Sequence, residues 1–317
     1  MKLKSNRNLE HDLRQNFKIH VYDNISQELM ESFLNEIDRL HYGEIVDYSN
    51  IRNFVKFLTS IEINFVENLY TIELESKVVE NTIYYYTKAV QDNINDDNYN
   101  FVFYLNWAVD IIKREELSLS NFLPITTIKK ILASLKEILY FNKGKFLLES
   151  SDGLKLQLQN LNLEVLKKTY DNFSPDRLCF MLMQQIFKSY TKEELRNLIT
   201  KYETQLNLND GPKEVVSKTN YLEEFVVYYE TITKIILNAF SNHNLFHVAF
   251  KEVIENIQSS NISFNISYIL PFYLDKNLKR STNSNTVDAA KIIDNLMSIF
   301  PSLSEKDIFI DIHRNLV

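Results

Sequence analysis

The sequence predicts an all-α protein, built as an elongated stack of helical bundles. The clearest support is the stretch 221–257, where apolar residues recur at steps of three and four. That spacing keeps side chains on one face of a helix. The 317 residues include only 4 Gly and 5 Pro, far below average shares of roughly 7% and 5%. This scarcity favours long helices over turn-rich sheets and Gly-rich phosphate-binding loops.

Two amphipathic helices joined by a polar turn account for the stretch 221–257. The apolar face of the first helix ends at Ala239 and Phe240, and that of the second begins at Phe246. Polar side chains between the two faces compete for backbone hydrogen bonds and favour a break in the helix. These residues are Ser241, Asn242, His243 and Asn244. Because both faces are apolar, we expect further helices to cover them.

Helical spacing also covers most of the first half of the chain. Residues 8–42 predict two helices with a break near Asp23 and Asn24, and Gly43 stands where a helix C-terminal cap is expected. Residues 49–90 predict helices with breaks that the pattern does not locate. The polar run 91–100 is expected to be a loop, and further helices are expected over 100–119 and 124–142.

The second half is predicted to be helical as well. Pro175 is expected early in a helix, and Thr191 with Glu194 has the capping-box spacing that predicts a separate helix start. The alternating run 154–161 fits either a strand or a helix. A loop is expected at 207–214 and a short helix at 270–280. A further helix is expected from Ala289 to Phe300. The last helix should run from Lys306 to Val317, with Ser304 and Asp307 as the capping pair at its start.

Composition limits the classes of function. The net charge of −7 and the pI of about 5.5 disfavour a general nucleic-acid binder. The single Cys179 cannot form an internal disulfide, which fits a reducing compartment. The N-terminus has no signal-peptide pattern, and the most apolar stretch, 101–112, is too short to span a bilayer. We therefore expect a soluble protein of the cytoplasm, the nucleus or both, with no membrane partner.

Few residues suggest chemistry. His243 and His247 have the i, i+4 spacing of two metal ligands, but no third ligand or HExxH pattern accompanies them. Cys179 lies in an apolar helix, where a buried small side chain is more common than a nucleophile. The pairs Glu193–Glu194 and Glu223–Glu224 are expected near helix starts, where they complement the helix dipole. The sequence thus predicts no catalytic residue, metal or cofactor.

The helix pair resembles a segment of the cullins, the scaffold subunits of modular ubiquitin ligases. The family has a helix ending in Ala-Phe, a polar turn around an Asn, a Phe, and then an Ala-apolar pair. The matching residues here are Ala239, Phe240, Asn242, Phe246, Ala249 and Phe250.

Four further stretches resemble cullin segments in the family's order. The first, 37–47, has Ile37, Asp38, Gly43 and Glu44 in place, and the second is the tyrosine-rich helix 82–90. The third, 270–280, matches at Leu270, Tyr273, Asp275, Leu278, Lys279 and Arg280, with Pro271 near the expected helix start. The fourth, 298–317, matches at Phe300, Leu303, Lys306, Asp307, Ile308 and Phe309.

The resemblance implies three cullin repeats, at 1–90 (partial), 91–206 and 207–317. It also implies a non-catalytic scaffold of a cullin-RING-type ubiquitin ligase, which holds an adaptor for a substrate receptor near its amino-terminal end. Most of the first repeat, where the family grips that adaptor, has no counterpart here. The carboxy-terminal domain that binds the RING protein is also expected to be missing. No partner-binding residue is therefore assigned.

Two alternatives remain beside this scaffold. One is another helical-bundle interaction protein, such as a vesicle-tethering subunit. The cullin-like residues at 306–309 argue against it, because a tethering subunit has no reason to contain them. The other is an all-α enzyme, which would need a pocket with clustered polar groups. No such cluster is evident in the sequence.

Overall fold

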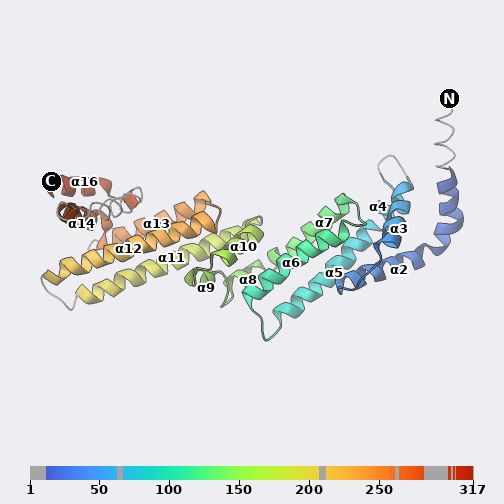
Figure 1. The fold of residues 1–317 in the computed structure, drawn as a ribbon, viewed down its shortest axis with the longest axis horizontal. Helices are drawn as coiled ribbons and strands as arrows, with labels where there is room; N and C mark the ends of the chain where they lie inside the picture. The colour runs from blue at the N-terminus through green and yellow to red at the C-terminus, as the bar shows by residue number, and fades with distance from the viewer. Residues whose placement is uncertain are drawn as a thin grey trace, which may run out of the picture. The chain divides into compact units, whose positions relative to one another are not determined.

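The computed structural model describes residues 12–62, 67–206, 212–260, 264–281, 299–300, 303 and 305–316. Across these ranges the regular secondary structure is helical, and Glu62 and Asn68 form an isolated bridge (Figure 1). The all-α prediction is confirmed. The chain divides into two compact units, Met1–Gly144 and Lys145–Val317.

In the first unit the long helices α5 and α6 both pack beside α7. Its elements are η1 (Lys18–Tyr22, a π-helix), α2 (Asp23–His41), α3 (Tyr48–Ser60), α4 (Leu69–Glu73), α5 (Glu75–Ile94), α6 (Phe101–Leu119), α7 (Ile125–Lys136) and η2 (Glu137–Phe141, a second π-helix). The predicted loop 91–100 is shorter than expected, because α5 continues to Ile94.

The second unit is organised around three long helices, with α11 packed against both α12 and α13. Its elements, of which α8 begins at the last residue of the first unit, are α8 (Gly144–Glu149), α9 (Leu154–Gln159), α10 (Leu163–Phe173), α11 (Arg177–Leu206), α12 (Pro212–Asn238), α13 (Asn244–Ser260), α14 (Ile266–Ser281) and α16 (Lys306–Leu316). The run 154–161 was predicted to be either a strand or a helix, and α9 shows that it is helical.

The predicted break at Asp23 and Asn24 is wrong. The helix that includes residues 12–17 passes through the π-helical turn η1 into α2, and the backbone N–H of Asp23 donates to the Lys18 carbonyl. Tyr22 is buried at this turn, and its hydroxyl donates to Glu73 at 2.7 Å. The polar side chains therefore do not end the helix, because the extra residue of the π turn lets Tyr22 face inward.

The predicted helix start at Thr191 is also wrong. Thr191 is buried in the middle of α11, and its hydroxyl donates to the Phe187 carbonyl at 2.9 Å. Phe187 and Leu195, four residues to either side, are buried as well. The capping spacing has no effect here because the apolar face continues without interruption and its burial favours one unbroken helix.

The helix pair of 221–257 is confirmed. The first helix, α12, ends at Asn238, and α13 begins at Asn244. In the turn, Ser241 and Asn242 take the left-handed conformation with φ of 50° and 55°. The rings of Phe240 and Phe246 stack across it with centroids 4.3 Å apart.

Three further predictions concern Pro271, the helix at 289–300 and the division into repeats. Pro271 lies inside α14, several residues after its start at Ile266. Residues 289–298 and Ser304 lie outside the described residues, so the helix and cap predicted there are not tested. The predicted repeats 1–90, 91–206 and 207–317 do not coincide with the unit boundary at Gly144, because α5 and α6 both pack on α7. The division into repeats stays a prediction.

Gly43 ends α2, as the sequence predicts. Its φ is +79°, its N–H donates to the Leu40 carbonyl at 2.9 Å, and the N–H of Glu44 donates to the Arg39 carbonyl at 2.9 Å. This is the Schellman arrangement that satisfies the last carbonyls of a helix. An added Cβ would meet no atom within 4 Å, so only the backbone conformation demands glycine.

We therefore expect Gly43→Ala to lower the free energy of unfolding by about 1 kcal/mol, since an L-residue is strained at positive φ. Asn tolerates this conformation better, so Gly43→Asn should cost less. Urea denaturation followed by the fluorescence of the single Trp107, which lies in the same unit, measures both variants. Equal stability of Gly43→Ala and wild type would contradict the assignment.

Candidate functional site

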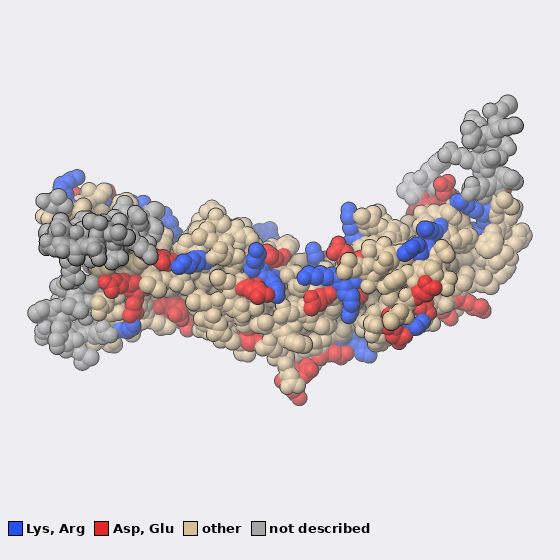
Figure 2. Space-filling view, viewed as in Figure 1, with Lys and Arg blue, Asp and Glu red and all other residues tan. Residues whose placement is uncertain are grey.

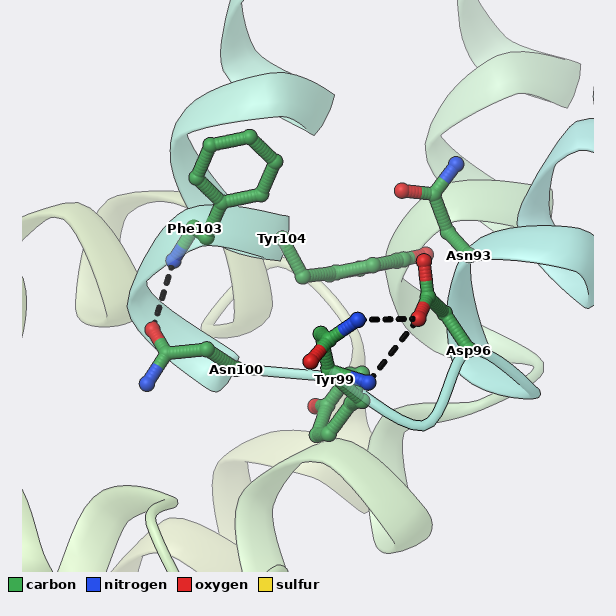
Figure 3. Close-up of a pocket in the computed structure, with 7 residues that line it drawn as sticks. Asn93, Asp96, Tyr99, Asn100, Phe103 and Tyr104 are labelled. Carbon is green, nitrogen blue, oxygen red and sulfur yellow. Dashed lines mark hydrogen bonds between the residues drawn. The ribbon is translucent and has the colours of Figure 1, made fainter.

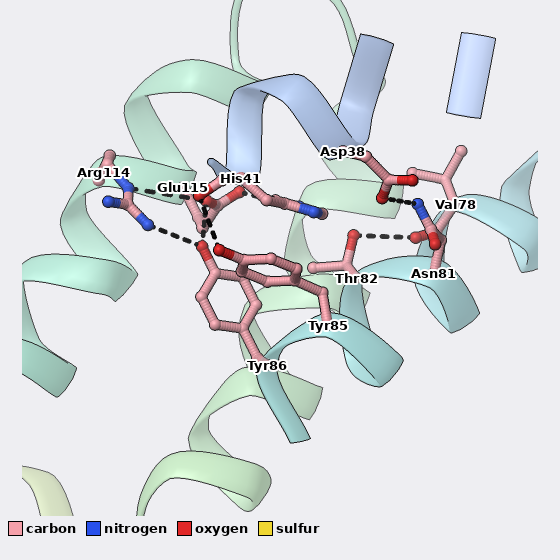
Figure 4. Close-up of polar contacts among 9 residues, drawn as sticks. All are labelled: Asp38, His41, Val78, Asn81, Thr82, Tyr85, Tyr86, Arg114 and Glu115. Atoms are coloured by element: carbon pink, nitrogen blue, oxygen red, sulfur yellow. Dashed lines mark hydrogen bonds and ion pairs between the residues drawn. The ribbon is translucent and has the colours of Figure 1, made fainter. Parts of the chain in front are cut away.

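A polar cluster with a buried centre joins three helices of the first unit (Figure 4). We call it the junction cluster: His41 is the last residue of α2, Tyr85 and Tyr86 lie on α5, and Arg114 and Glu115 lie on α6. His41, Tyr86 and Glu115 are buried, Tyr85 is half-buried and Arg114 is exposed. Their side chains point toward one another in Figure 4.

The hydroxyl of Tyr86 links the charged members of the junction cluster. It donates a hydrogen bond to Oε1 of Glu115 and accepts one from Nη2 of Arg114 at 3.0 Å. The Tyr85 hydroxyl donates to the backbone carbonyl of His41 at 3.1 Å. The end of α2 is thus tied to α5, and α5 to α6, by groups that each need a partner when they are buried.

Burial controls the protonation of the junction cluster. It raises the pKa of Glu115, and the hydrogen bond from Tyr86 and the charge of Arg114 oppose that rise. It lowers the pKa of His41 to about 4, an effect that Arg114 adds to and Asp38 opposes. Nε2 of His41 lies 3.8 Å from Oε2 of Glu115. At neutral pH the imidazole is therefore uncharged beside this carboxyl group.

The junction cluster is arranged to hold helices together, and it is poorly placed for catalysis. The ring of His41 stacks on Tyr85 with centroids 4.8 Å apart and meets the edge of Tyr86 at 5.4 Å. The imidazole is therefore covered by aromatic rings, and the residue is only 2% exposed. A general acid or base must come within hydrogen-bond reach of a substrate, and this packing denies that approach.

A second feature is a hollow beside the turn between α5 and α6 (Figure 3). Its polar groups are engaged in ordering the chain: Oδ1 of Asp96 accepts from the N–H of Asn98 at 2.8 Å, and Oδ1 of Asn100 accepts from the N–H of Phe103 at 3.0 Å. The second contact caps the N-terminus of α6. These oxygens support the turn, so they do not form a free ligand set.

His243 and His247 each contact a neighbouring group at the α12–α13 turn. Nδ1 of His243 accepts from the N–H of Leu245 at 3.2 Å, and Nε2 of His247 lies 2.7 Å from Oδ1 of Asn242. Among the described residues there is no group of three or more His, Cys, Asp or Glu side chains that could hold a metal ion. The two imidazoles instead stabilise the turn that precedes α13.

Cys179 is buried near the start of α11. Burial and the neighbouring Asp176 raise the pKa of its thiol to about 12, so the reactive thiolate is disfavoured at neutral pH.

The prediction that the two acidic pairs lie near helix starts is wrong. Glu193 and Glu224 lie well inside α11 and α12, and they pair with Lys155 and Lys201, each at 2.7 Å. Glu223 accepts a hydrogen bond from the Tyr273 hydroxyl at 3.1 Å. The error follows from placing the helix starts too late in the chain. These carboxylates connect neighbouring helices instead of complementing a dipole.

Comparison with known proteins identifies the kind of helical fold. The sequence matches the cullin alpha solenoid domain over residues 4–317. The chain belongs to the cullin family. The resemblance predicted from the sequence is thereby confirmed.

Several curated cullins are similar to this cullin chain. Cullin-3 of Dictyostelium discoideum is 24% identical over 288 residues, which cover 90% of the chain and 35% of that protein. Cullin-3A of Arabidopsis thaliana is 22% identical over 292 residues, covering 91% and 37%. Cell division control protein 53 of Saccharomyces cerevisiae is 22% identical over 330 residues, covering 93% and 39%. The chain therefore spans little more than a third of the length of these relatives.

The residues that carry the cullin resemblance are mostly packing residues. Ala239, Phe240, Phe246 and Phe250 are buried at the α12–α13 turn. In the last segment, the Phe300 and Phe309 rings meet at 5.2 Å. The side chains of Leu278, Lys279 and Arg280 lie outside the described ones. Among these described residues, the family pattern thus marks how helices pack.

No local pattern in the sequence predicts the junction cluster. The tyrosines of 82–90 stand out only as part of a family segment, and Arg114 and Glu115 belong to no motif. A charged residue at an otherwise apolar helical position, such as Glu115 on α6, was the one available signal.

Within the described ranges no helix is long and apolar enough to cross a membrane.

We expect Tyr86→Phe to lower the free energy of unfolding of the first unit by about 1–3 kcal/mol, because it removes a donor from a buried carboxyl group. Tyr84→Phe is the matched control: Tyr84 lies on the same helix, is 74% exposed, and should change stability by less than about 0.5 kcal/mol. Urea denaturation reports both. Equal effects would show that Glu115 does not depend on Tyr86.

The junction cluster also predicts a pH dependence. The pKa of His41 in the folded chain, about 4, lies below its ordinary value of 6.5, so protonation favours the unfolded chain. Stability from this group is present above pH 6.5 and is lost as pH falls toward 4, by up to about 3 kcal/mol.

The pKa of Glu115 moves in the opposite direction and offsets part of this loss. We therefore compare wild type with His41→Gln, which retains the Glu115 contribution. Urea denaturation at pH 7 and pH 5 should show a larger loss of stability for wild type than for the variant. The same loss in both would assign the pH dependence to other groups.

Proposed function

We propose that the protein is a scaffold subunit of a cullin-RING-type ubiquitin ligase, and that this chain is the stalk between two modules. The observation that most directly supports this proposal is the match to the cullin alpha solenoid domain over residues 4–317. In this proposal an adaptor for the substrate receptor binds toward the amino-terminal end, and the RING protein binds a carboxy-terminal domain. The stalk itself is non-catalytic and acts in the cytoplasm, the nucleus or both.

The physical features support a spacer. In the junction cluster the Tyr85 and Tyr86 hydroxyls contact groups on neighbouring helices, and the side chains described above in the α5–α6 and α12–α13 turns order those turns. Long helices packed along their lengths bend little, because each would have to expose apolar surface. A stiff stack of such bundles would hold two modules at a set separation.

Surface charge agrees with a protein-binding role. On the face in Figure 2, Lys and Arg side chains are interspersed with Asp and Glu over the described parts of both units. A protein that binds nucleic acid through phosphates would present a basic stripe. The vesicle-tethering alternative receives no support from the family match.

Affinity purification of the tagged full-length gene product from its own cells tests the proposal. We expect a RING-finger protein and an adaptor to co-purify, and the purified complex to form ubiquitin chains with an E1 and an E2 enzyme. Recovery of neither partner, with no chain formation, would overturn the proposed function.

Flexible insertions then test the stalk separately from partner binding. About ten Gly and Ser residues inserted between Asn142 and Lys143, at the boundary of the two units, should lower ubiquitin transfer while both partners still co-purify. The same insert after Asp97, in the turn between α5 and α6, is the control and should have little effect, since loop tips tolerate insertions. Unchanged transfer in both would rule out a rigid spacer while leaving the scaffold intact.

A further inference from the structure

A shallow groove runs between α11 and α13 in the second unit. We call it the α11–α13 groove. Its lining repeats at helical spacing on both helices: Met181, Gln184, Gln185 and Lys188 on α11, and Leu245, Val248, Ala249 and Glu252 on α13. An ion pair between Lys188 and Glu252 closes one end.

Apolar side chains gather along this groove. Met181 is 46% exposed, Leu245 is 45% exposed and Val248 is 42% exposed. Leu178, three residues before Met181 on α11, is 75% exposed, and this spacing puts it on the same side of the helix. Single exposed apolar residues are common, but a contiguous group suggests a contact surface. Methionine is frequent in such surfaces because its side chain adapts to different partners.

The size of the groove favours side chains over a small molecule. Its volume is about 280 Å³, at the lower limit of small-molecule pockets, which hold roughly 300–1,000 Å³. Two neighbouring helices with parallel rows of lining residues instead suit a third helix, which would insert apolar side chains at i, i+3 or i+4, and i+7.

The charged residues around the groove indicate which charge the partner helix should carry. The one acid that lines the groove, Glu252, pairs with Lys188, and Glu255, three residues further on α13, pairs with Lys251. Two cations on the groove side of α11 remain: Arg177, one turn before Met181, and Lys192, one turn after Lys188. Both are exposed and pair with no carboxylate in the part of the chain that the structure describes.

We propose that the α11–α13 groove binds an acidic amphipathic helix of a partner protein. Its apolar stripe covers Met181, Leu245 and Val248, and its flanking carboxylates meet Arg177 and Lys192. This inference rests on the proposed function, which puts the adaptor toward the amino-terminal end and the RING protein on a carboxy-terminal domain; the groove on α11 and α13 would then be a third point of attachment on the stalk.

The test uses a fluorescein-labelled peptide of about 18 residues, long enough to form a helix. It has a Leu stripe flanked by Glu, and the matched peptide has Lys in place of each Glu. Fluorescence anisotropy with the chain 1–317 measures both affinities. We expect the acidic peptide to bind at least about tenfold more tightly than the basic one, and its binding to weaken as salt is added.

Surface variants locate the site without touching the core. The double variant Met181→Asp, Val248→Asp should weaken the acidic peptide at least about tenfold, and Lys192→Glu should weaken it and flatten the salt dependence. Val227→Asp, on the exposed face of α12, is the control and should bind as wild type does. Circular dichroism checks that each variant stays helical.

Several results would overturn the proposal. These are no binding of the acidic peptide at millimolar concentration, equal affinity for the two peptides, and unchanged affinity in the double variant. Sedimentation analysis adds one more: a dimer of the chain that the double variant abolishes would assign the groove to a second copy.

Discussion

The structure depends on burying apolar helix faces that cannot be covered within a single helix. The clearest case is the α12–α13 turn, where Phe240 and Phe246 stack on each other and both meet Phe187 of α11, at 5.7 and 5.2 Å. Aromatic pairs of this kind add about 0.5–1.5 kcal/mol beyond the area that they bury. Because α11 also carries the proposed groove, the same contacts set the position of its outer surface.

Buried polar groups make this packing specific. The junction cluster around Glu115 ties three helices of the first unit together, and a second network links Tyr70, Thr127, Glu75 and Lys130 across α4, α5 and α7. A displaced helix would leave a carboxyl group buried without donors, at a cost far larger than that of a displaced apolar side chain. Such groups suit a chain whose proposed task is to keep a separation constant.

Function in this chain is proposed to lie in surfaces. The family residues at Ala239, Phe240 and Phe246 are buried, so they contribute to the packing of the shared fold. The proposed groove uses neighbours of the same helices that point outward, such as Met181 and Val248. A family can therefore keep its interior pattern while the exposed rows of the same helices carry different partners.

Local sequence patterns were sufficient to predict the helical class, the α12–α13 pair and the cap at Gly43, because helical spacing and positive φ act within a few residues of the chain. They failed at Asp23 and Thr191, where local signals for a helix end were overruled by burial of Tyr22 and by the continuous apolar face around Thr191. Only the tertiary structure brought His41, Tyr86 and Glu115 together, since they come from three helices and no local rule couples them. The same holds for the groove, because residue spacing cannot show which face of α11 its neighbour leaves exposed.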